Sequence, residues 1–546
     1  MMRRARPPKA FAPLVSLTTL TTLTVLAACA RQVTVSSGPG SASATSRTST
    51  STSTSTGTGA AATGMGVSAR ILPNDEVPSL DAIRADDLRR DLFALAGDAM
   101  RGREAGTLDE LRASGWLVEQ LRAIGVEPAG EDGTYYQWWN IRRIRQSDAS
   151  VVRVGGERLA MWRDVVIPQA VDATLDLPLL YVGRATEQEL QGQSLAGKAV
   201  VAQIVAPPNP PGRNVSLSSW RYAGAAVRGQ SARLATLGAS AIILVADSVV
   251  ESALEFYGAV SARGSYGLDT AGALTRPRPT TPVMVVRQRM LPALQAPGAR
   301  LTATLTSESF TYPSVNIVGR VTGSDPRRRD EYVLFSGHQD HDGVRFAIDG
   351  DSIWNGADDN ATVSVAMLAI ARAWKRQPNP RSALWVWHGA EERGLLGSRW
   401  HAMHPMVPRE QIVAVLNGDM IGRNHPDSAS LLGIQPPHRN SRDLVAHALR
   451  ANELTGRFVL DSLWDRPSHP EGWYFRSDHL PYARLNIPAV MYSTNLHPDY
   501  HTPRDNPDRI DIAKLQRMTQ WMYATGWLVG VAARRPAVDA GFRLER

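Results

Sequence analysis

The sequence predicts an α/β protein whose central sheet is covered by helices on both faces and is interrupted by a β-rich inserted unit. Beyond residue 313, apolar runs of strand length alternate with helical patterns, which is typical of such a sheet. The strand runs cover residues 332–336, 384–387, 412–416 and 488–492, and the clearest helix covers residues 362–374. Between residues 150 and 310 the helical pattern thins. β-branched runs at residues 199–205, 241–245 and 283–286, separated by proline and glycine clusters, predict the inserted unit.

The composition limits the class of protein. Apolar residues make up 43% and charged residues 21% of the 546 residues, as in ordinary soluble proteins. This excludes a wholly disordered chain and a membrane protein with many spans. The formal charge of +8 comes mainly from residues 1–69, which hold six basic residues and no acid, so the remaining chain is close to neutral. We therefore expect no nucleic acid partner.

The N-terminus is predicted to direct the protein out of the cytoplasm. Three arginines within residues 3–6 precede an apolar, threonine-rich stretch at residues 11–28, which is the pattern of a secretory signal. The stretch ends in Leu-Ala-Ala-Cys, and Cys29 is the only cysteine of the chain. This tetrad resembles a bacterial lipobox, which implies a signal peptide at residues 1–28 and a lipid on Cys29. We expect an exported lipoprotein, anchored to a membrane through Cys29 and facing the periplasm or the cell exterior; an ordinary signal peptide with a chance cysteine is the alternative.

The segment after Cys29 differs from the folded body. Residues 29–68 consist largely of Ser, Thr, Gly and Ala, which cannot offset the entropy lost on folding. We expect a flexible tether there. Apolar residues at helical spacing then predict two helices between residues 86 and 125 that open the folded body.

Chemistry-bearing residues gather at the ends of the predicted strands. All twelve histidines lie between His338 and His501. Histidines and carboxylates follow the strand runs in five stretches, at residues 337–340, 356–360, 390–394, 417–420 and 497–502. Two histidines and three carboxylates are the donors that a pair of divalent metals needs. The neighbouring Glu391 and Glu392 have diverging side chains, so that one can bind metal while the other acts as a base.

These stretches resemble the M28 family of zinc aminopeptidases, in the bacterial form with an inserted protease-associated domain. The resemblance covers roughly residues 86–515 and depends on residues 100–107, 337–340, 356–360, 390–398, 419–422, 477–479 and 497–503. It implies a mixed central sheet of the zinc-exopeptidase type. The catalytic domain would comprise residues 69–150 and 311–546, and the protease-associated domain residues 151–310. A generic β-rich insertion is the alternative for the second unit.

The resemblance also implies the residues of a two-zinc centre. His338, Asp359 and Asp419 would bind one zinc ion, and Asp359, Glu392 and His501 the other, with Asp359 as the bridge. The donor set contains no thiolate, so manganese or cobalt also fits.

Three further roles follow from the same family pattern. Glu391 would be the general base, Asp340 would fix the tautomer of His338, and Tyr500 would donate a hydrogen bond to the developing oxyanion. Two departures concern packing near the site: Thr362-Val363 stands where the family commonly has Ser-Gly, and Gly418 precedes Asp419 where a larger apolar residue is usual.

The remaining histidines are expected to be structural or to lie at the surface. His341 is among them, although with Asp342 it would fit a phosphohydrolase pair, in which the two glutamates have no role. His479 and His497 lie within the motif stretches and are expected to shape the pocket.

The implied activity is hydrolysis of the N-terminal bond of a peptide substrate by a hydroxide bound to two zinc ions. A carboxypeptidase or other amidohydrolase on the same scaffold is one alternative, and a non-catalytic binding protein that uses the inserted domain is another. Carboxylates beside the motifs favour a free amine as the recognised group, whereas arginines would favour a free carboxylate. The carboxylates are Asp358, Asp478 and Asp499, and the arginines are Arg423, Arg466, Arg476 and Arg484.

Overall fold

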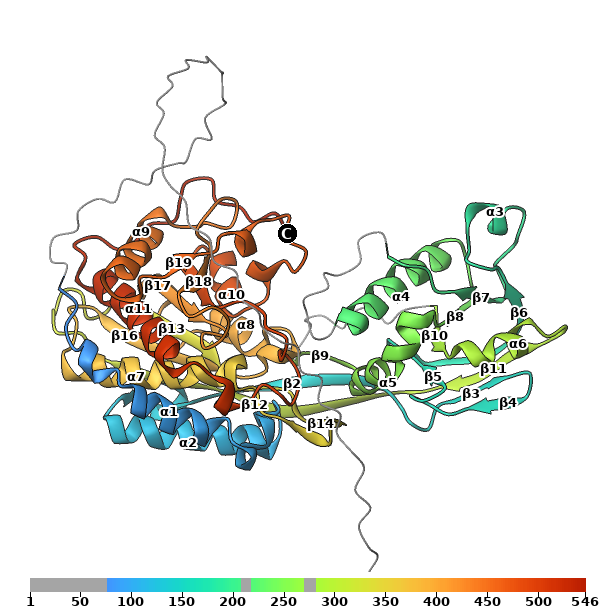
Figure 1. The fold of residues 1–546 in the computed structure, drawn as a ribbon, viewed down its shortest axis with the longest axis horizontal. Coiled ribbons are helices and arrows are strands. Elements are labelled where there is room, and N and C mark those ends of the chain that lie inside the picture. The colour runs from blue at the N-terminus through green and yellow to red at the C-terminus, as the bar shows by residue number, and fades with distance from the viewer. Residues whose placement is uncertain (1–75, 208–217, 270–280) are drawn as a thin grey trace, which may run out of the picture. The chain divides into compact units, whose positions relative to one another are not determined.

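The strand runs predicted beyond residue 313 form the centre of a mixed sheet of ten strands (Figure 1). The computed structural model describes residues 76–207, 218–269 and 281–546, so the predicted export signal, the tether and Cys29 lie outside the described residues. Four neighbouring strands run parallel: β20 (Ala489–Ser493), β17 (Ile412–Gly418), β13 (Tyr332–His338) and β16 (Ser382–His388). They correspond to the four apolar runs read from the sequence.

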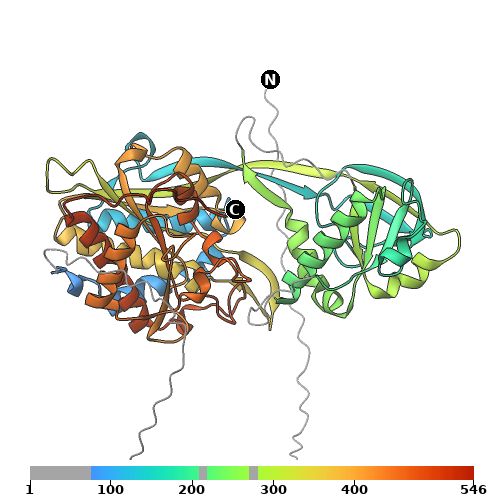
Figure 2. The ribbon, with the colours of Figure 1, turned by 90° about the horizontal axis from the view of Figure 1, so that it is seen from above.

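Further strands extend this sheet on both sides. The full order is β19, β18, β20, β17, β13, β16, β12, β2 and β9, and β1 pairs with β12. These outer strands are β1 (Glu127–Pro128), β2 (Tyr136–Gln146), β9 (Ser265–Leu268), β12 (Ser307–Val321), β18 (Ser428–Leu432) and β19 (Val459–Leu460). Both β2 and β18 pair antiparallel with their inner neighbours, which makes the sheet mixed, as expected. The long strands β2 and β12 lie side by side in both ribbon views (Figure 2).

Helices cover both faces of this sheet, because successive residues of its buried strands point to opposite sides. Val333 and Phe335 of β13 belong to the core that contains α1, α2, α7, α9 and α11, whereas Leu334 packs with α8 and α10. The helices are α1 (Ala85–Leu95), α2 (Leu108–Ile124), α7 (Thr362–Arg376), α8 (Leu396–Met403), α9 (Arg442–Ala451), α10 (His479–Arg484) and α11 (Ile512–Val531). Two of them, α1 and α2, are the opening helices predicted between residues 86 and 125.

The inserted unit contains a second sheet, of eight strands. The runs predicted at residues 199–205, 241–245 and 283–286 are its strands β7 (Ala199–Gln203), β8 (Ala241–Val245) and β10 (Val283–Val286). Its other strands are β3 (Val151–Val154), β4 (Glu157–Leu159), β5 (Val165–Val166), β6 (Ala173–Tyr181) and β11 (Arg300–Leu305). The unit is therefore rich in strands, as expected.

Helices that the sequence did not predict cover one face of this second sheet. They are α4 (Ser218–Thr236) and α5 (Ser248–Arg263), which share a core with alternate residues of β7 and β8. Both helices also carry alanine, glycine and serine among their apolar residues, so that the contrast between buried and exposed positions is weak in the sequence. The shorter helices α3 (Glu187–Leu190) and α6 (Leu291–Gln295) complete the unit.

One further pair of described strands lies outside the two main sheets. A hairpin of β14 (Gly343–Ile348) and β15 (Asp351–Trp354) lies between β13 and α7 in the chain. Among the described helices, none has the length and apolarity that spanning a bilayer requires.

Candidate metal centre

The predicted site residues meet at one edge of the larger sheet, where its four parallel strands end. His338 is the last residue of β13, and Glu391 and Glu392 follow β16 after a sharp turn at Ala390, which has a φ of 52°. Asp419 directly follows β17. The carboxyl ends of parallel strands are the usual location of ligand sites in open α/β sheets. The topology thus brings together residues that are far apart in the chain.

A first group of donors contains His338, Glu391 and Asp419. His338 Nε2 lies 3.8 Å from Glu391 Oε2 and 3.8 Å from Asp419 Oδ1. It also lies 3.2 Å from Oδ1 of Asp359. These side chains are almost entirely buried, so the group is shielded from bulk water.

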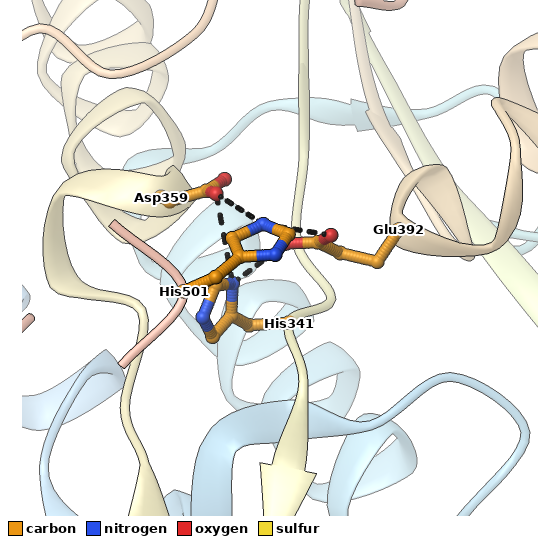
Figure 3. A group of neighbouring side chains, drawn as sticks. All are labelled: His341, Asp359, Glu392 and His501. Atoms are coloured by element: carbon orange, nitrogen blue, oxygen red, sulfur yellow. Dashed lines mark ion pairs between the residues drawn. The ribbon is translucent and has the colours of Figure 1, made fainter. Parts of the chain in front are cut away.

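A second group contains His341, Asp359, Glu392 and His501 (Figure 3). His501 Nε2 lies 3.1 Å from Asp359 Oδ2 and 3.1 Å from Glu392 Oε2. His341 Nδ1 lies 2.8 Å from Glu392 Oε1 and 4.0 Å from Asp359 Oδ2. Since Asp359 directs one carboxylate oxygen to each group, it is placed as a bridge between them.

His341 is the member of this cluster that the sequence analysis did not select. It was expected to be structural, yet it is buried within the second group. Its position three residues after His338, in the loop that leaves β13, is the only signal in the sequence. That signal is weak, because a histidine there is just as compatible with a packed or exposed loop.

The buried donor atoms of both groups fit a metal centre. His338 Nδ1 lies 3.0 Å from the backbone oxygen of Asp340, which only accepts, so Nδ1 donates and the lone pair of Nε2 faces the carboxylates. Several buried atoms in the cluster meet only one another and make no hydrogen bond of good geometry among the described residues: His338 Nε2, both ring nitrogens of His341, His501 Nε2 and Glu392 Oε1. Buried lone pairs that converge in this way repel one another unless cations separate them. Imidazole and carboxylate donors without thiolate suit zinc, manganese or cobalt.

The concentrated negative charge shifts the pKa values of the cluster. Burial alone would lower the pKa of His338, but Glu391 and the neighbouring carboxylates raise it well above its usual range. Burial opposes protonation of His501 as well, yet Glu392 and other carboxylates raise its pKa to about 10. Burial raises the pKa of Glu391 well above its usual range, and nearby Asp419 adds to this increase. The cluster therefore attracts positive charge strongly.

Asp340 supports the turn that carries the two glutamates. Its carboxylate accepts hydrogen bonds from the backbone N–H groups of Glu391, at 3.0 Å, and Glu392, at 3.3 Å. Its contact with His338 is made by the backbone oxygen, at 3.0 Å, while the nearer carboxylate oxygen lies 3.7 Å from Nδ1. Asp340, which follows β13, thus fixes the position of the turn that follows β16.

Arg103 connects the N-terminal motif at residues 100–107 with the site. Its side chain is fully buried, and its guanidinium donates to three backbone oxygens of the site loops: Gln339 at 2.8 Å, Asn355 at 2.7 Å and Gly356 at 2.9 Å. These loops carry the residues next to His338 and Asp359. The sequence resemblance included this motif but assigned it no role, and the hydrogen bonds indicate a positioning role.

The position of Tyr500 is set by two neighbours. Its ring stacks on the ring of His501, with 3.9 Å between centroids, and its hydroxyl accepts a hydrogen bond of 2.8 Å from Arg476. Burial raises the pKa of Tyr500 well above its usual range, so that its hydroxyl stays protonated at neutral pH.

Two of the three aspartates expected to receive an amine have protein partners instead. Asp358 Oδ2 lies 3.4 Å from His497 Nε2, and Asp499 accepts a hydrogen bond of 2.7 Å from Arg423. Asp478 is fully buried near Glu391, and burial raises its pKa to about 7.

The two departures from the family pattern compensate each other. A Cβ added at Gly418 would lie 2.9 Å from both Cγ atoms of Val363 and 3.2 Å from Met522 Cε. The Val363 side chain also occupies the space beside Gly337, where an added Cβ would lie 2.5 Å from Cγ1. Valine at the start of α7 is therefore accommodated by glycine at the ends of β13 and β17.

Part of the chain is similar in sequence to known peptidases. Residues 316–526 match peptidase family M28. Aminopeptidase YwaD of Bacillus subtilis is 29% identical over 225 residues, which cover 39% of this chain and 45% of that protein. The chain spans about half the length of the curated relatives it matches.

Solved structures share the fold over a longer part of the chain. An aminopeptidase from Aneurinibacillus sp. strain AM-1 has a TM-score of 0.52 and 17% identity, covering 84% of this chain and 96% of that one. BSAP, a zinc aminopeptidase from Bacillus subtilis, has a TM-score of 0.52 and 18% identity, covering 81% and 94%.

Proposed function

Since residues 316–526 match peptidase family M28, we propose that the chain is a metal-dependent aminopeptidase that hydrolyses the N-terminal peptide bond of its substrate. The observation that carries this proposal is the sharing of Asp359 between two buried donor groups at the carboxyl ends of the parallel strands. Such an arrangement has no evident structural purpose, because it places unpaired donors and like charges together in the interior.

The two groups assign the residues that would hold metal. His338, Asp359 and Asp419 would hold one divalent ion, and His341, Asp359, Glu392 and His501 the other. When bound, such ions supply Lewis acidity toward the peptide carbonyl and lower the pKa of a water molecule. Zinc is proposed because the structural neighbour BSAP is described as a zinc aminopeptidase, and manganese or cobalt fits the same donors.

The protein side chains would move the protons of the reaction. Glu391 takes a proton from the attacking water and delivers it to the leaving amine, so that water is added across the broken peptide bond. The Tyr500 hydroxyl donates a hydrogen bond to the carbonyl oxygen as negative charge develops there. Asp340 keeps Glu391 in position through the backbone hydrogen bond at 3.0 Å.

Metal content tests the assignment of the donors. Elemental analysis of purified, zinc-loaded protein should give two ions per chain. Asp359→Ala should lose both ions, because each group loses its shared carboxylate, whereas His341→Ala should weaken binding of one ion only. One ion or none in the wild-type protein would contradict the two-metal proposal, and full retention of both ions by His341→Ala would remove His341 from the second group.

Substrate polarity tests the activity. Two peptides that differ only in a free or acetylated N-terminus should be incubated with the metal-loaded enzyme, with and without a chelator. We expect cleavage of the free peptide alone, and loss of that cleavage on chelation. Cleavage from the carboxyl end only would support the carboxypeptidase alternative, and no cleavage of any peptide would support the non-catalytic one.

A further inference from the structure

Four arginines line a cavity of about 600 Å³ beside the donor cluster. They are Arg399 on α8, Arg476, Arg484 on α10 and Arg546. The only acidic side chain among the lining residues is that of Glu471. The cavity therefore has a strong excess of positive charge.

The single carboxylate of the cavity does not balance this charge. Glu471 accepts a hydrogen bond of 2.9 Å from Arg476 and also contacts Arg221. Among the described residues, no aspartate or glutamate side chain lies within ion-pair distance of the other three arginines.

The neighbours of those three arginines balance only part of their charge. Arg484 approaches a terminal carboxyl oxygen of Arg546, the last residue of the structure, at 3.5 Å, and the Arg546 guanidinium lies over the Phe475 ring at 4.1 Å. Burial, together with the charge of Arg484, lowers the pKa of Arg399. Arg484 and Arg546 are exposed, so water screens the repulsion between these positive charges, and an anionic ligand would reduce it further.

The cavity adjoins the proposed active site. Arg476 lines the cavity and also donates to the Tyr500 hydroxyl at 2.8 Å, and the Tyr500 ring stacks on His501 of the second donor group. Leu395 also lines the cavity, and it lies three residues after Glu392 in the chain. A substrate held at the donor cluster can therefore reach the cavity with its neighbouring residues.

We propose that this arginine-lined cavity binds a carboxylate of the peptide substrate. Guanidinium groups bind carboxylates through paired, charge-assisted hydrogen bonds. The carboxylate can come from an acidic side chain of the substrate or from the C-terminus of a short peptide. The inference rests on the proposed peptidase activity, and it adds a preference for substrates with a negative charge beyond the first residue.

Matched peptides distinguish the two sources of the carboxylate. Leu-Ala-Ala is compared with its C-terminal amide to test the terminal carboxylate. Leu-Glu-Ala-amide is compared with Leu-Gln-Ala-amide to test an acidic side chain. In the wild-type enzyme, at least one carboxylate peptide should have a KM about 10- to 100-fold lower than its neutral partner, as expected for hydrogen bonds between charged groups. The difference should appear chiefly in KM, because the carboxylate binds away from the reacting bond.

Substitutions in the cavity test which residues produce the preference. Arg484→Gln and Arg399→Gln should each reduce the ratio of the two KM values, and Arg484→Lys should retain more of it. Arg158→Gln changes an exposed arginine on β4 of the inserted unit and should leave the ratio unchanged. Thermal denaturation identifies any variant that fails to fold, and the remaining cavity variant then provides the test.

A binding measurement separates this inference from the proposed function. Acetyl-Glu-amide and acetyl-Gln-amide are titrated calorimetrically into the chelator-treated protein, where no turnover is needed. Selective binding of the Glu compound, lost in Arg484→Gln, would support the inference even if no peptide were cleaved. Equal KM values within both peptide pairs, together with no selective binding, would overturn it while leaving the aminopeptidase proposal intact.

Discussion

At the scale of single residues, two adjacent glutamates face different parts of the donor cluster. Glu391 Oε2 lies 3.8 Å from His338 Nε2, whereas Glu392 contacts His341 and His501 of the second group. This division follows from the short turn after β16, in which neighbouring side chains must diverge. It predicts that changing each glutamate to glutamine affects metal binding and catalysis differently.

Glu391→Gln should keep its metal and lose most of kcat, because only proton transfer is removed, and such transfers contribute roughly 10²–10⁴-fold in rate. Glu392→Gln should lose metal from the second group as well as activity. Elemental analysis and peptide hydrolysis on the same samples provide both measurements. Activity of Glu391→Gln near that of the wild type would show that another residue is the base.

His447 on α9 predicts a pH dependence of stability that is independent of the metal centre. Burial lowers the pKa of His447 to about 4, despite the opposing charge of Asp443. The unfolded chain therefore binds a proton at this residue below about pH 6.5, while the folded chain does not. Folding stability should decrease as the pH falls from 6.5 to 4, and His447 alone should account for about 2 kcal/mol between pH 7 and pH 5.

Urea denaturation of the wild type and His447→Gln at pH 7 and pH 5 measures this contribution. The variant should lose less free energy of unfolding on acidification, because glutamine remains neutral. His425→Gln, at an exposed position, is the matched control. Equal losses for the wild type and His447→Gln would show that His447 is protonated in the folded protein.

At the scale of elements, the site depends on close packing between the start of α7 and the ends of β13 and β17. α7 is buried along nearly its whole length, and four of its residues are alanines, which allow the sheet to approach closely. Val363 is the bulkier residue at this junction, and the absence of side chains at Gly337 and Gly418 makes room for it. Since Asp359 precedes α7 and Asp419 follows β17, this packing sets the separation of two proposed metal ligands.

Gly418→Ala should destabilise the protein by about 1–3 kcal/mol, because its new methyl group overlaps both Cγ atoms of Val363. Adding Val363→Ala should recover part of this loss, so that the double variant is more stable than the sum of the single changes predicts, by about 1 kcal/mol or more.

Gly115→Ala on α2 is the matched control for this cycle, because an added Cβ there meets nothing within 4 Å. It should stabilise the helix by about 0.5–1 kcal/mol. Chemical denaturation of the wild type, the two single variants, the double variant and Gly115→Ala provides the data. Strict additivity of the Gly418 and Val363 changes would contradict the proposed complementarity.

At the scale of the whole molecule, the N-terminal segment is proposed to anchor the folded body to a membrane through Cys29. Cys29→Ser should therefore release the exported protein into the soluble fraction and abolish incorporation of a labelled fatty acid. Fractionation of cells that express the two proteins measures both effects. Membrane retention of the unlabelled variant would instead indicate an uncleaved N-terminal segment or a bound partner.

The sequence by itself determined where the central strands lie along the chain and at which edge of the sheet the chemistry lies. Apolar runs of strand length separated by a helix must be buried, and parallel strands place their carboxyl ends at one edge. The histidines and carboxylates that follow these runs therefore had to meet. For this reason His338, Glu391, Glu392 and Asp419 could be selected before any coordinates were known.

The tertiary structure alone decided which further side chains complete the site. His341 joins the second donor group because of the path that the loop takes after β13, and no periodicity in the sequence encodes that path. The same is true of the arginine-lined cavity, where Arg399, Arg484 and Arg546 come from distant parts of the chain, and of the fit between Val363 and Gly418. Periodicity reports whether a residue is buried, whereas contacts between distant segments depend on how loops and layers pack, and that is set only in three dimensions.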